Sequence, residues 1–232
     1  MTNINKIPKP EPTERADRPS ASGRERWGAC PGSHELEQAA GKGDETEAMR
    51  RGTLIHSVMA GDTATDKLTE DEFVIYDQIL LNDSNVSSFY EDDGYTLLDE
   101  GKELRYWFPG RLFSGQLDKV QLYEKDSKLV VVIIDYKTGV TGPLVKAENN
   151  GQLEALMALL NCQVVFSAEW HTWIVHQEGA NQAVYEQAAV GKITKQINLE
   201  LEAMAVAKPT RTVGAHCTWC NAKGICPGEG YC

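Results

Sequence analysis

Apolar residues are most concentrated in one short run near the middle of the chain, and this run predicts the central strand. Residues 129–134 are all apolar and mostly β-branched, and the turn-forming pair Thr138-Gly139 follows closely. Such a run is typical of a strand that is buried on both faces. The run ends in Asp135, Tyr136 and Lys137, and the two-residue period of a strand places Asp135 and Lys137 on one face. We therefore expect a carboxylate and an ammonium group side by side at the exposed end of this strand.

The segments around this strand follow helical and extended patterns. Apolar residues at helical spacing predict helices over residues 46–60, after the capping box Thr69–Glu72, over residues 149–161, and around Ile193 to Met204. A shorter helix is expected to start at an N-cap, Ser33. Strand patterns cover residues 95–100, 102–109, 111–123 and 164–176. This order predicts an α/β fold with a mixed central sheet flanked by helices.

The two ends of the chain differ in composition from its middle. Residues 1–20 are rich in proline and charge, which predicts a disordered tail. Residues 21–210 predict one domain, the core, and residues 211–232 form a cysteine-rich segment. The N-terminus has no apolar signal region, and no segment reaches the roughly 20 apolar residues of a membrane span. We therefore expect a cytoplasmic protein whose six cysteines serve as metal ligands or core residues rather than disulfides.

Charge limits the ways in which this chain can bind nucleic acid. The net charge is −11, the opposite of what a protein that coats DNA through its overall field shows. A local basic channel stays compatible with this charge, because acidic residues crowd elsewhere. They cluster at Glu91, Asp92, Asp93, Asp99, Glu100 and Glu103. We expect this run, apart from Glu103, to form a solvated loop.

Three further side chains are candidates to act with Asp135 and Lys137, a pair that suits metal-assisted phosphodiester cleavage. In antiparallel pairing Asp118 would lie beside Asp135, and converging carboxylates repel each other unless a cation lies between them. His56 borders the apolar stripe of its predicted helix, and Gln152 lies in the first turn of the helix after the central strand. Each candidate also has an ordinary alternative. These alternatives are a surface ion pair for Asp135 and Lys137, an outward strand acid for Asp118, a core histidine for His56 and an exposed helix residue for Gln152.

Cysteines are concentrated at the end of the chain. Four of them follow a C-x2-C-x5-C-x5-C pattern, at Cys217, Cys220, Cys226 and Cys232. Thiolates at such spacings suit a metal ion or an iron–sulfur cluster. Cys30 competes with Cys232 as the fourth ligand, and entropy favours Cys30 because Cys232 is the last residue of a frayed terminus. The ordinary alternative for Cys30 is a small buried residue.

Taken in chain order, these features resemble the RecB-like branch of the PD-(D/E)XK nuclease superfamily. The matching features are His56, the G-x-x-D motif that ends at Asp118, the D-x-K motif of Asp135 and Lys137, Gln152, and the cysteine spacing. The resemblance spans residues 21–228 and implies a restriction-endonuclease-like core. The segments ASGRERWGACPGS and HCTWCNAKGIC are also similar to those of phage and prophage nuclease-like proteins.

The resemblance implies a role for each of these residues. His56, Asp118, Asp135 and the backbone carbonyl of Tyr136 would bind Mg²⁺ or Mn²⁺, Lys137 would position the attacking water, and Gln152 would contact the water or the phosphate. Glu103 is the candidate for the glutamate that often precedes the G-x-x-D strand in this family, with Glu100 as the reserve. The ligands of a [4Fe–4S] cluster would be Cys30, Cys217, Cys220 and Cys226, with Cys232 as the reserve.

The implied function is that of a metal-dependent DNA nuclease, an exonuclease that acts on DNA ends or single strands in phage or prophage DNA processing or recombination within a bacterial host. The chain has no G-x-x-x-x-G-K-[ST] motif, so any unwinding would come from a helicase or recombination partner. The oligomeric state stays open. The main alternative is a catalytically inactive nucleic-acid- or protein-binding module with a structural zinc site. A further alternative is a structural zinc protein that uses Cys217, Cys220, Cys226 and Cys232.

Overall fold

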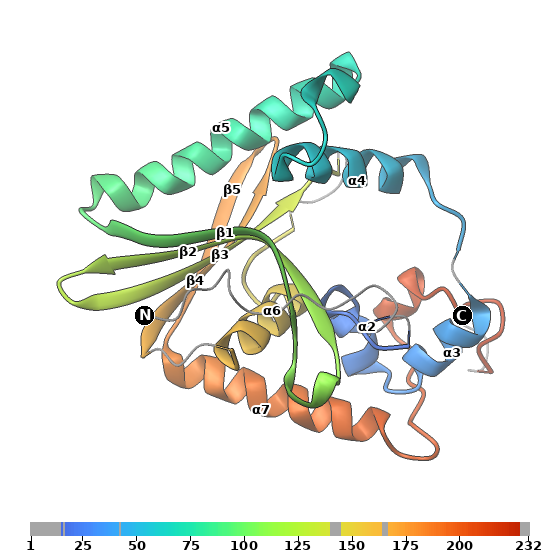
Figure 1. The fold of residues 1–232 in the computed structure, drawn as a ribbon. Coiled ribbons are helices and arrows are strands. Elements are labelled where there is room, and N and C mark those ends of the chain that lie inside the picture. The colour runs from blue at the N-terminus through green and yellow to red at the C-terminus, as the bar shows by residue number, and fades with distance from the viewer. Residues whose placement is uncertain (1–14, 16, 42, 140–144, 164–166, 228–232) are drawn as a thin grey trace.

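A mixed five-stranded sheet forms the centre of the fold (Figure 1). The computed structural model describes residues 15, 17–41, 43–139, 145–163 and 167–227. The strands lie in the order β1 (Thr96–Trp107), β2 (Ser114–Lys125), β3 (Lys128–Lys137), β4 (Ala168–His176) and β5 (Gly179–Tyr185). Neighbours are antiparallel except β3 and β4, which run parallel. The expected α/β fold with a mixed sheet is therefore confirmed.

The apolar run predicted as the central strand forms β3 and is buried from Val130 to Ile134. Its side chains divide between two cores, because successive residues point to opposite faces. Val131 and Ile133 pack in the larger core, whereas Val132 and Ile134 pack in the smaller one. The turn from β2 to β3 uses Asp126 and Ser127 with φ of 51° and 61°, the left-handed conformation that suits a two-residue hairpin. Burial on both faces therefore fixes β3 at the middle of the sheet.

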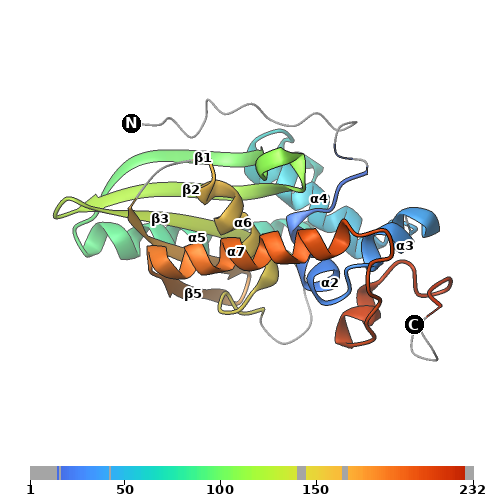
Figure 2. The same ribbon diagram turned by 90° about the horizontal axis from the view of Figure 1, so that it is seen from below.

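Helices cover both faces of the sheet (Figures 1 and 2). One face carries α4 (Glu47–Ala60) and α5 (Glu70–Asp92), and the other carries α2 (Arg24–Ala29), α6 (Gly151–Asn161) and α7 (Gln187–Met204). The capping box predicted at Thr69 is present, since the Thr69 hydroxyl accepts from Glu72 N and the Glu72 carboxylate accepts from Thr69 N. The helix predicted over residues 46–60 is confirmed as α4, with Thr46 as its N-cap. Local capping therefore sets where these helices begin.

Several expectations about local structure are wrong. Glu91 and Asp92 belong to α5, and Asp99 and Glu100 belong to β1, so the acidic run is not one solvated loop. The helix extends this far because Val86 and Tyr90 continue its buried stripe against the sheet. The two strands predicted over residues 95–109 form one strand, β1, which pairs with β2 along its whole length. Strand β5 was not predicted, and its polar sequence at the edge of the sheet explains why.

Other boundaries differ by a few residues. Ser33 is the first residue of α3 (Ser33–Ala40), and Gly32 takes the N-cap position. The strand predicted from residue 164 begins at Ala168, and residues 164–166 lie outside the described part of the chain. Short 3-10 helices connect the larger elements: η2 (Ala21–Gly23), η3 (Thr65–Lys67), η4 (Pro109–Arg111) and η5 (Ala215–Trp219). These differences do not change the order of the main elements.

The N-terminal tail was expected to extend to residue 20. Residues 1–14 and 16 lie outside the described part of the chain. Pro19 and Ser20 contact the sheet, because Ser114 N donates to Pro19 O at 3.2 Å and Ser20 forms an isolated bridge with Ser114. Contacts with the sheet therefore begin just before Ala21, and Asp17 O already lies 3.3 Å from His34 Nε2.

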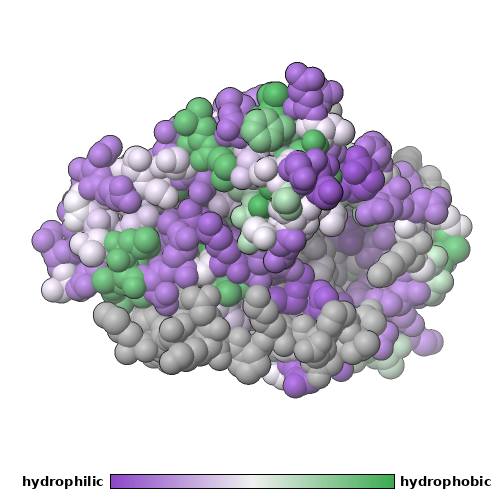
Figure 3. All heavy atoms as spheres, turned by 45° about the horizontal axis from the view of Figure 1, so that its top comes forward, coloured by the Kyte–Doolittle hydropathy of each residue, from purple (hydrophilic) through white to green (hydrophobic). Residues whose placement is uncertain are grey.

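Exposed apolar side chains on the outer face of α5 include Phe73, Val74 and Leu81. Figure 3 shows apolar groups among hydrophilic residues on that side of the molecule. Among the described residues, no helix has both the length and the apolar character that a membrane span requires.

Candidate active site

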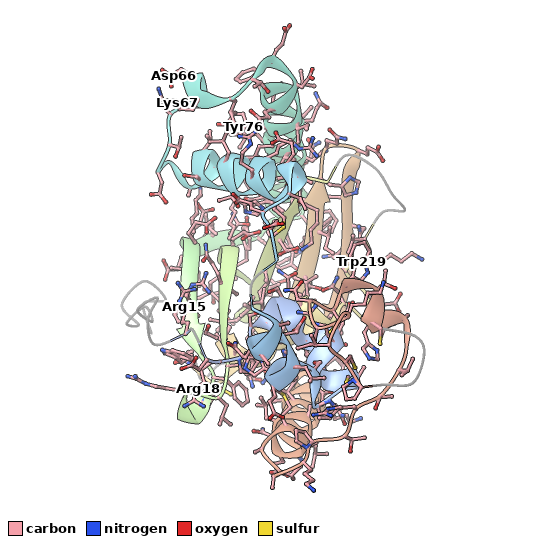
Figure 4. The ribbon with its side chains drawn as sticks, turned by 90° about the vertical axis from the view of Figure 1, so that its right-hand side faces the viewer. Arg15, Arg18, Asp66, Lys67, Tyr76 and Trp219 are labelled. Atoms are coloured by element: carbon pink, nitrogen blue, oxygen red, sulfur yellow. The ribbon has the colours of Figure 1, made fainter. Side chains whose placement is uncertain are left out.

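A cleft of about 700 Å³ opens where β1 and β2 leave β3. Helix α4 contributes one wall, and the strands β1, β2 and β3 together with the start of α6 contribute most of the rest. The cleft is lined by every residue predicted for the active site from side-chain chemistry: His56, Glu103, Asp118, Asp135, Lys137 and Gln152. Figure 4 views this side of the molecule, with α4 above the short helices of the N-terminal segment. Residues far apart in sequence thus meet in one cavity.

Asp135, Lys137 and Gln152 form a closed set of contacts at the end of β3. Lys137 Nζ lies 2.6 Å from Asp135 Oδ2 and donates to Gln152 Oε1 at 3.0 Å. Gln152 Nε2 in turn donates to Asp135 Oδ1 at 2.7 Å. Asp135 is only 3% exposed, so the expectation of an exposed strand end is wrong for this residue. The first turn of α6 covers it, because Asn150 caps that helix and directs Gln152 toward β3.

Three ligand-type side chains converge beside this set. One nitrogen of His56 and carboxylate oxygens of Glu103 and Asp118 all lie within 4.8 Å of one another. His56 Nδ1 lies 3.6 Å from Asp118 Oδ1, and Asp118 Oδ2 accepts a hydrogen bond from Tyr136 N at 2.8 Å. The last paired residues of β2 and β3 are Lys119 and Ile134, so Asp118 and Asp135 follow at the point where the strands separate. This arrangement fits the expected approach of the two carboxylates.

Glu103 rather than Glu100 lies at this cluster. Glu100 accepts from Gln121 Nε2 at 2.8 Å and lies 3.5 Å from Lys119 Nζ, outside the cleft. Glu103 has φ of 50°, a left-handed conformation that is uncommon for a residue with a side chain and is often found at functional sites. Its carboxylate accepts a hydrogen bond from Gln116 Nε2. The two glutamates therefore differ in their surroundings, since Glu103 lies at the ligand cluster and Glu100 lies outside the cleft.

The electrostatics of the cleft favour a bound cation. Burial raises the pKa of Asp135, Asp118 raises it further, and Lys137 opposes both effects. Burial and the charge of Asp118 also raise the pKa of Glu103. Burial disfavours a charged His56, but the hydrogen bond and the charge of Asp118 outweigh this effect and leave its pKa raised. Carboxylates that are held together in this way are ionised most readily with a cation among them.

The donor set fits a divalent metal. Two or three carboxylates and one imidazole are ligands that Mg²⁺ and Mn²⁺ accept. His56, Glu103 and Asp118 would hold such an ion, with Asp135 close by. For Tyr136, the contacts of its backbone nitrogen and its hydroxyl are defined, and the expected role of its carbonyl stays a prediction.

A second group of residues supports the site from behind and was missed in the sequence. The Tyr136 hydroxyl donates to Asp83 Oδ1 at 3.1 Å, and Lys119 Nζ donates to Asp83 Oδ2 at 2.9 Å. Lys119 is only 4% exposed. The sequence contains one signal for this group, the lysine within the apolar pattern of β2, because a buried ammonium group needs an acidic partner.

A chain of hydrogen bonds also extends from Glu103 along β1 and β2. Gln116 donates to Glu103 and accepts from Arg105 Nη2. Arg105 pairs with Gln116 across the two strands and lines the cleft. Partial burial lowers the pKa of Arg105 to about 10, and the charge of nearby Arg15 contributes. Neither Gln116 nor Arg105 could be selected from the sequence, because only the register of β1 on β2 brings them together.

The cysteines form a second candidate site. Cys30, Cys217, Cys220 and Cys226 line one small cavity. Thr212 N donates to Cys30 Sγ at 3.3 Å, and Gly214 N donates to Cys217 Sγ at 3.4 Å. Backbone N–H donors of this kind stabilise metal-bound thiolates, so the chemistry of the four cysteines suits a cysteine-ligated centre. Among the described residues, however, no three of these sulfur atoms lie within 4.8 Å of one another, in contrast to the ligand atoms of His56, Glu103 and Asp118. Cys232 lies outside the described residues.

Contacts between the two ends of the chain bring Cys30 to this cavity. Gly32 N donates to Thr210 O at 2.9 Å, and a Cβ at Gly32 would lie 2.8 Å from Arg211 Cγ, so this close approach requires glycine. Glu37 Oε1 accepts from Asn221 N at 3.0 Å and lies 2.7 Å from Arg26 Nε. Helices α2 and α3 therefore support the C-terminal segment, as the proximity of these parts in Figure 1 shows.

The sequence of this chain matches a known protein family. A family model described as the PD-(D/E)XK nuclease superfamily matches residues 18–227. Among solved structures, the one titled "Crystal structure of SSO0001" is similar with a TM-score of 0.39 and 11% identity, over 97% of this chain and 91% of that chain. A comparison with curated proteins gives no match.

Proposed function

The chain belongs to the PD-(D/E)XK nuclease superfamily, and we propose that it is a divalent-metal-dependent deoxyribonuclease that acts as an exonuclease on DNA ends or single strands. The observation that supports this proposal most strongly is the convergence of His56, Glu103 and Asp118 beside Asp135 and Lys137. An inactive binding module would have no physical reason to keep Asp118 close to Asp135 and Glu103, whose pKa values are raised, in an open cleft.

Four side chains are proposed to hold Mg²⁺ or Mn²⁺: His56, Glu103, Asp118 and Asp135, with the carbonyl of Tyr136 as an additional oxygen. When bound, such an ion polarises the scissile phosphate and lowers the pKa of a nearby water. Hydrogen bonds from neighbours fix the orientation of the carboxylates, since Tyr136 N holds Asp118 and Gln152 holds Asp135. Such support is what keeps ligands in place between turnovers.

Lys137 is proposed to position the attacking water. Its Nζ contacts both Asp135 and Gln152, so the ammonium group is fixed at the edge of the acid cluster. From there it can donate a hydrogen bond to the water and offset the negative charge that develops on the phosphate. Gln152 shares this position and would contact the water or a phosphate oxygen.

The four cysteines of the second cavity are proposed to hold a [4Fe–4S] cluster, with Cys30 rather than Cys232 as the fourth ligand. The shared cavity and the N–H donors to sulfur support this assignment. The cluster would connect the two ends of the chain and act structurally. Zinc is the alternative that metal analysis would distinguish.

The proposed setting is phage or prophage DNA processing or recombination in the cytoplasm of a bacterial host. For any unwinding of duplex DNA, a helicase or recombination partner is proposed.

The decisive experiment is digestion of matched DNA substrates by the purified protein. We expect cleavage of end-labelled linear DNA in Mg²⁺ or Mn²⁺, no cleavage in EDTA, and resistance of covalently closed circles. Cleavage of circles would replace exonuclease with endonuclease action. Binding of DNA without cleavage under any metal condition would support the alternative of an inactive module.

A further inference from the structure

One arginine, Arg105, lines the cleft, and a second, Arg15, lies beside the strands on the same side of the molecule (Figure 4). Among the described residues, no ion pair joins Arg105 or Arg15 to a carboxylate. Gln116 is the hydrogen-bond acceptor of Arg105, and the charge of Glu103 raises the pKa of Arg105 only in part against burial and Arg15. Arg105 lies two residues beyond Glu103 on β1, and Gln116 lies two residues before Asp118 on β2. The guanidinium group of Arg105 therefore lies next to the candidate metal ligands and lines the same cavity.

Arg15 adds a second positive charge beside the strands that carry Arg105 and Gln116. Its charge is close enough to influence that of Arg105, and its Nε atom is buried without a hydrogen-bond partner. Figure 4 shows Arg15 beside the strands on this side of the molecule. Two guanidinium groups that are close together and partly removed from water repel each other, and an anion between them removes the cost. The overall charge of −11 makes such a local concentration of positive charge more distinctive.

We infer that Arg105 and Arg15 form a binding site for a phosphate group of the polynucleotide, adjacent to the phosphate that is cleaved. The inference rests on the proposed nuclease function and adds to it the residues that hold the substrate backbone. Guanidinium groups suit this ligand because their planar donors match phosphate oxygens in pairs. Gln116 would connect the two subsites, since one end of its amide orients Arg105 and the other orients Glu103.

The same chemistry could come from an internal phosphate or from a phosphate at a DNA end. An internal phosphate carries one negative charge and occurs in every substrate. A terminal phosphate carries more charge at neutral pH, and recognition of it would favour attack from an end. The experiment below separates these sources by comparing 5′-phosphorylated with 5′-hydroxyl oligonucleotides.

The test measures DNA binding in Ca²⁺, under conditions in which the oligonucleotide stays intact, for Arg105→Gln and Arg15→Gln. We expect Arg105→Gln to bind single-stranded DNA roughly 10- to 100-fold more weakly, as for loss of a charged hydrogen bond. The slope of log K against log salt should fall by about 0.7 for each phosphate contact removed. The matched controls are Lys102→Gln, an exposed cation on the same strand outside the cleft, and Arg18→Gln, an exposed cation near Arg15.

A structural role for Arg105 would weaken binding of every DNA alike, so the second arm neutralises one phosphate at a time with a methylphosphonate. The wild type should lose affinity most at one position near the cleavage site, and Arg105→Gln should lose no more there. Arg105→Lys should recover part of the binding.

Equal binding and equal salt slopes for Arg105→Gln and Lys102→Gln, in a protein that still cleaves DNA, would overturn the phosphate site and leave the nuclease function standing. A uniform loss of affinity with no position-specific effect of the methylphosphonate would assign Arg105 to structural support and also overturn the site. Failure of the wild type to bind or cleave DNA would overturn both proposals.

Discussion

The cleft and the cysteine cavity both gather side chains that favour metals, yet the chain builds them in different ways. The cleft lies on regular elements from the middle of the chain, and hydrogen bonds among its own side chains and backbone hold it together. The cysteine cavity lies between the connection of α2 to α3 and the last described segment of the chain. A few backbone and ion-pair contacts join these two parts.

This difference predicts that substitutions in the cleft and substitutions in the cysteine cavity have different effects on catalysis and on stability. The cleft is supported by the sheet and two helices, so a change in one of its side chains should affect catalysis more than folding. The cysteine cavity has little regular structure of its own, so its stability should depend on what the cysteines bind. The following predictions test this contrast, from the largest expected effect to the smallest.

Asp135→Asn and Lys137→Ala should each lower the rate of cleavage by about 10³-fold or more, because both residues belong to one catalytic unit. The melting temperature should change little for Lys137→Ala, whose side chain is partly exposed. Asp66→Asn and Lys67→Ala are the matched controls, since both residues lie in η3, away from the cleft (Figure 4). Full activity of either cleft variant, in a preparation free of other nucleases, would refute the assignment.

Cys30→Ser should lose the bound cofactor and destabilise the protein by roughly 3 kcal/mol or more, since cofactor binding contributes to folding. Cys162→Ser is the control, because Cys162 is exposed and does not line the cavity. Cys232→Ser should be nearly silent. Iron, sulfide and zinc analysis with melting curves provides the measurement. If Cys232→Ser loses the metal and Cys30→Ser retains it, the ligands are the four cysteines of the C-terminal segment and the cluster assignment fails.

The order of motifs and the main elements could be predicted from sequence because they depend on local chemistry. The apolar run of β3, the capping box at Thr69 and the first-turn position of Gln152 all arise within a few residues. The burial of Asp135 could not be predicted, because it depends on a helix that starts sixteen residues later folding back over the strand.

The choice between Glu103 and Glu100 also required the structure. It depends on an irregularity in the pairing of β1 after Leu97 and on the left-handed conformation of Glu103. Similarly, Asp83 and Lys119 support Tyr136 only because α5 crosses the sheet at that point. Contacts between distant segments are set by packing, and a single sequence records packing only indirectly.

His56→Ala should weaken metal binding by at least the roughly 10- to 100-fold that loss of a supporting residue costs. Activity should fall in Mg²⁺ and recover in part when Mn²⁺ is raised. This outcome would support His56 as a metal ligand in the cleft. If His56 is instead a core histidine, activity will follow the melting temperature at every metal concentration, and metal titrations beside melting curves separate the two cases.

Tyr136→Phe tests the support behind the cleft. It removes the hydroxyl that donates to Asp83 and leaves the ring in place. We expect a loss of about 1 kcal/mol in stability and a threefold to tenfold fall in kcat, roughly the effect of a slight misplacement of Asp118 and Asp135. Tyr76→Phe on α5 is the matched control. An unchanged kcat would show that the backbone alone positions the carboxylates.

The smallest expected effect comes from His171, a buried histidine that belongs to neither site. Burial lowers its pKa, although Glu169 opposes this effect from 2.7 Å. Gln182 Nε2 and the Tyr90 hydroxyl lie 3.0 and 2.7 Å from its Nδ1, and an amide donor at that nitrogen favours the neutral ring.

Because the folded state prefers neutral His171, its contribution to stability is complete above the ordinary pKa of 6.5 and is lost as the pH falls below that value. Urea unfolding of the wild type between pH 7.5 and 5 should therefore show a small decrease toward acid that is smaller in His171→Gln. The difference between the wild type and His171→Gln should be the same with and without added Mg²⁺, because His171 faces α5 and not the cleft. A metal-dependent difference between the two proteins would instead couple this histidine to the carboxylate cluster, and the cleft would no longer be an independent unit.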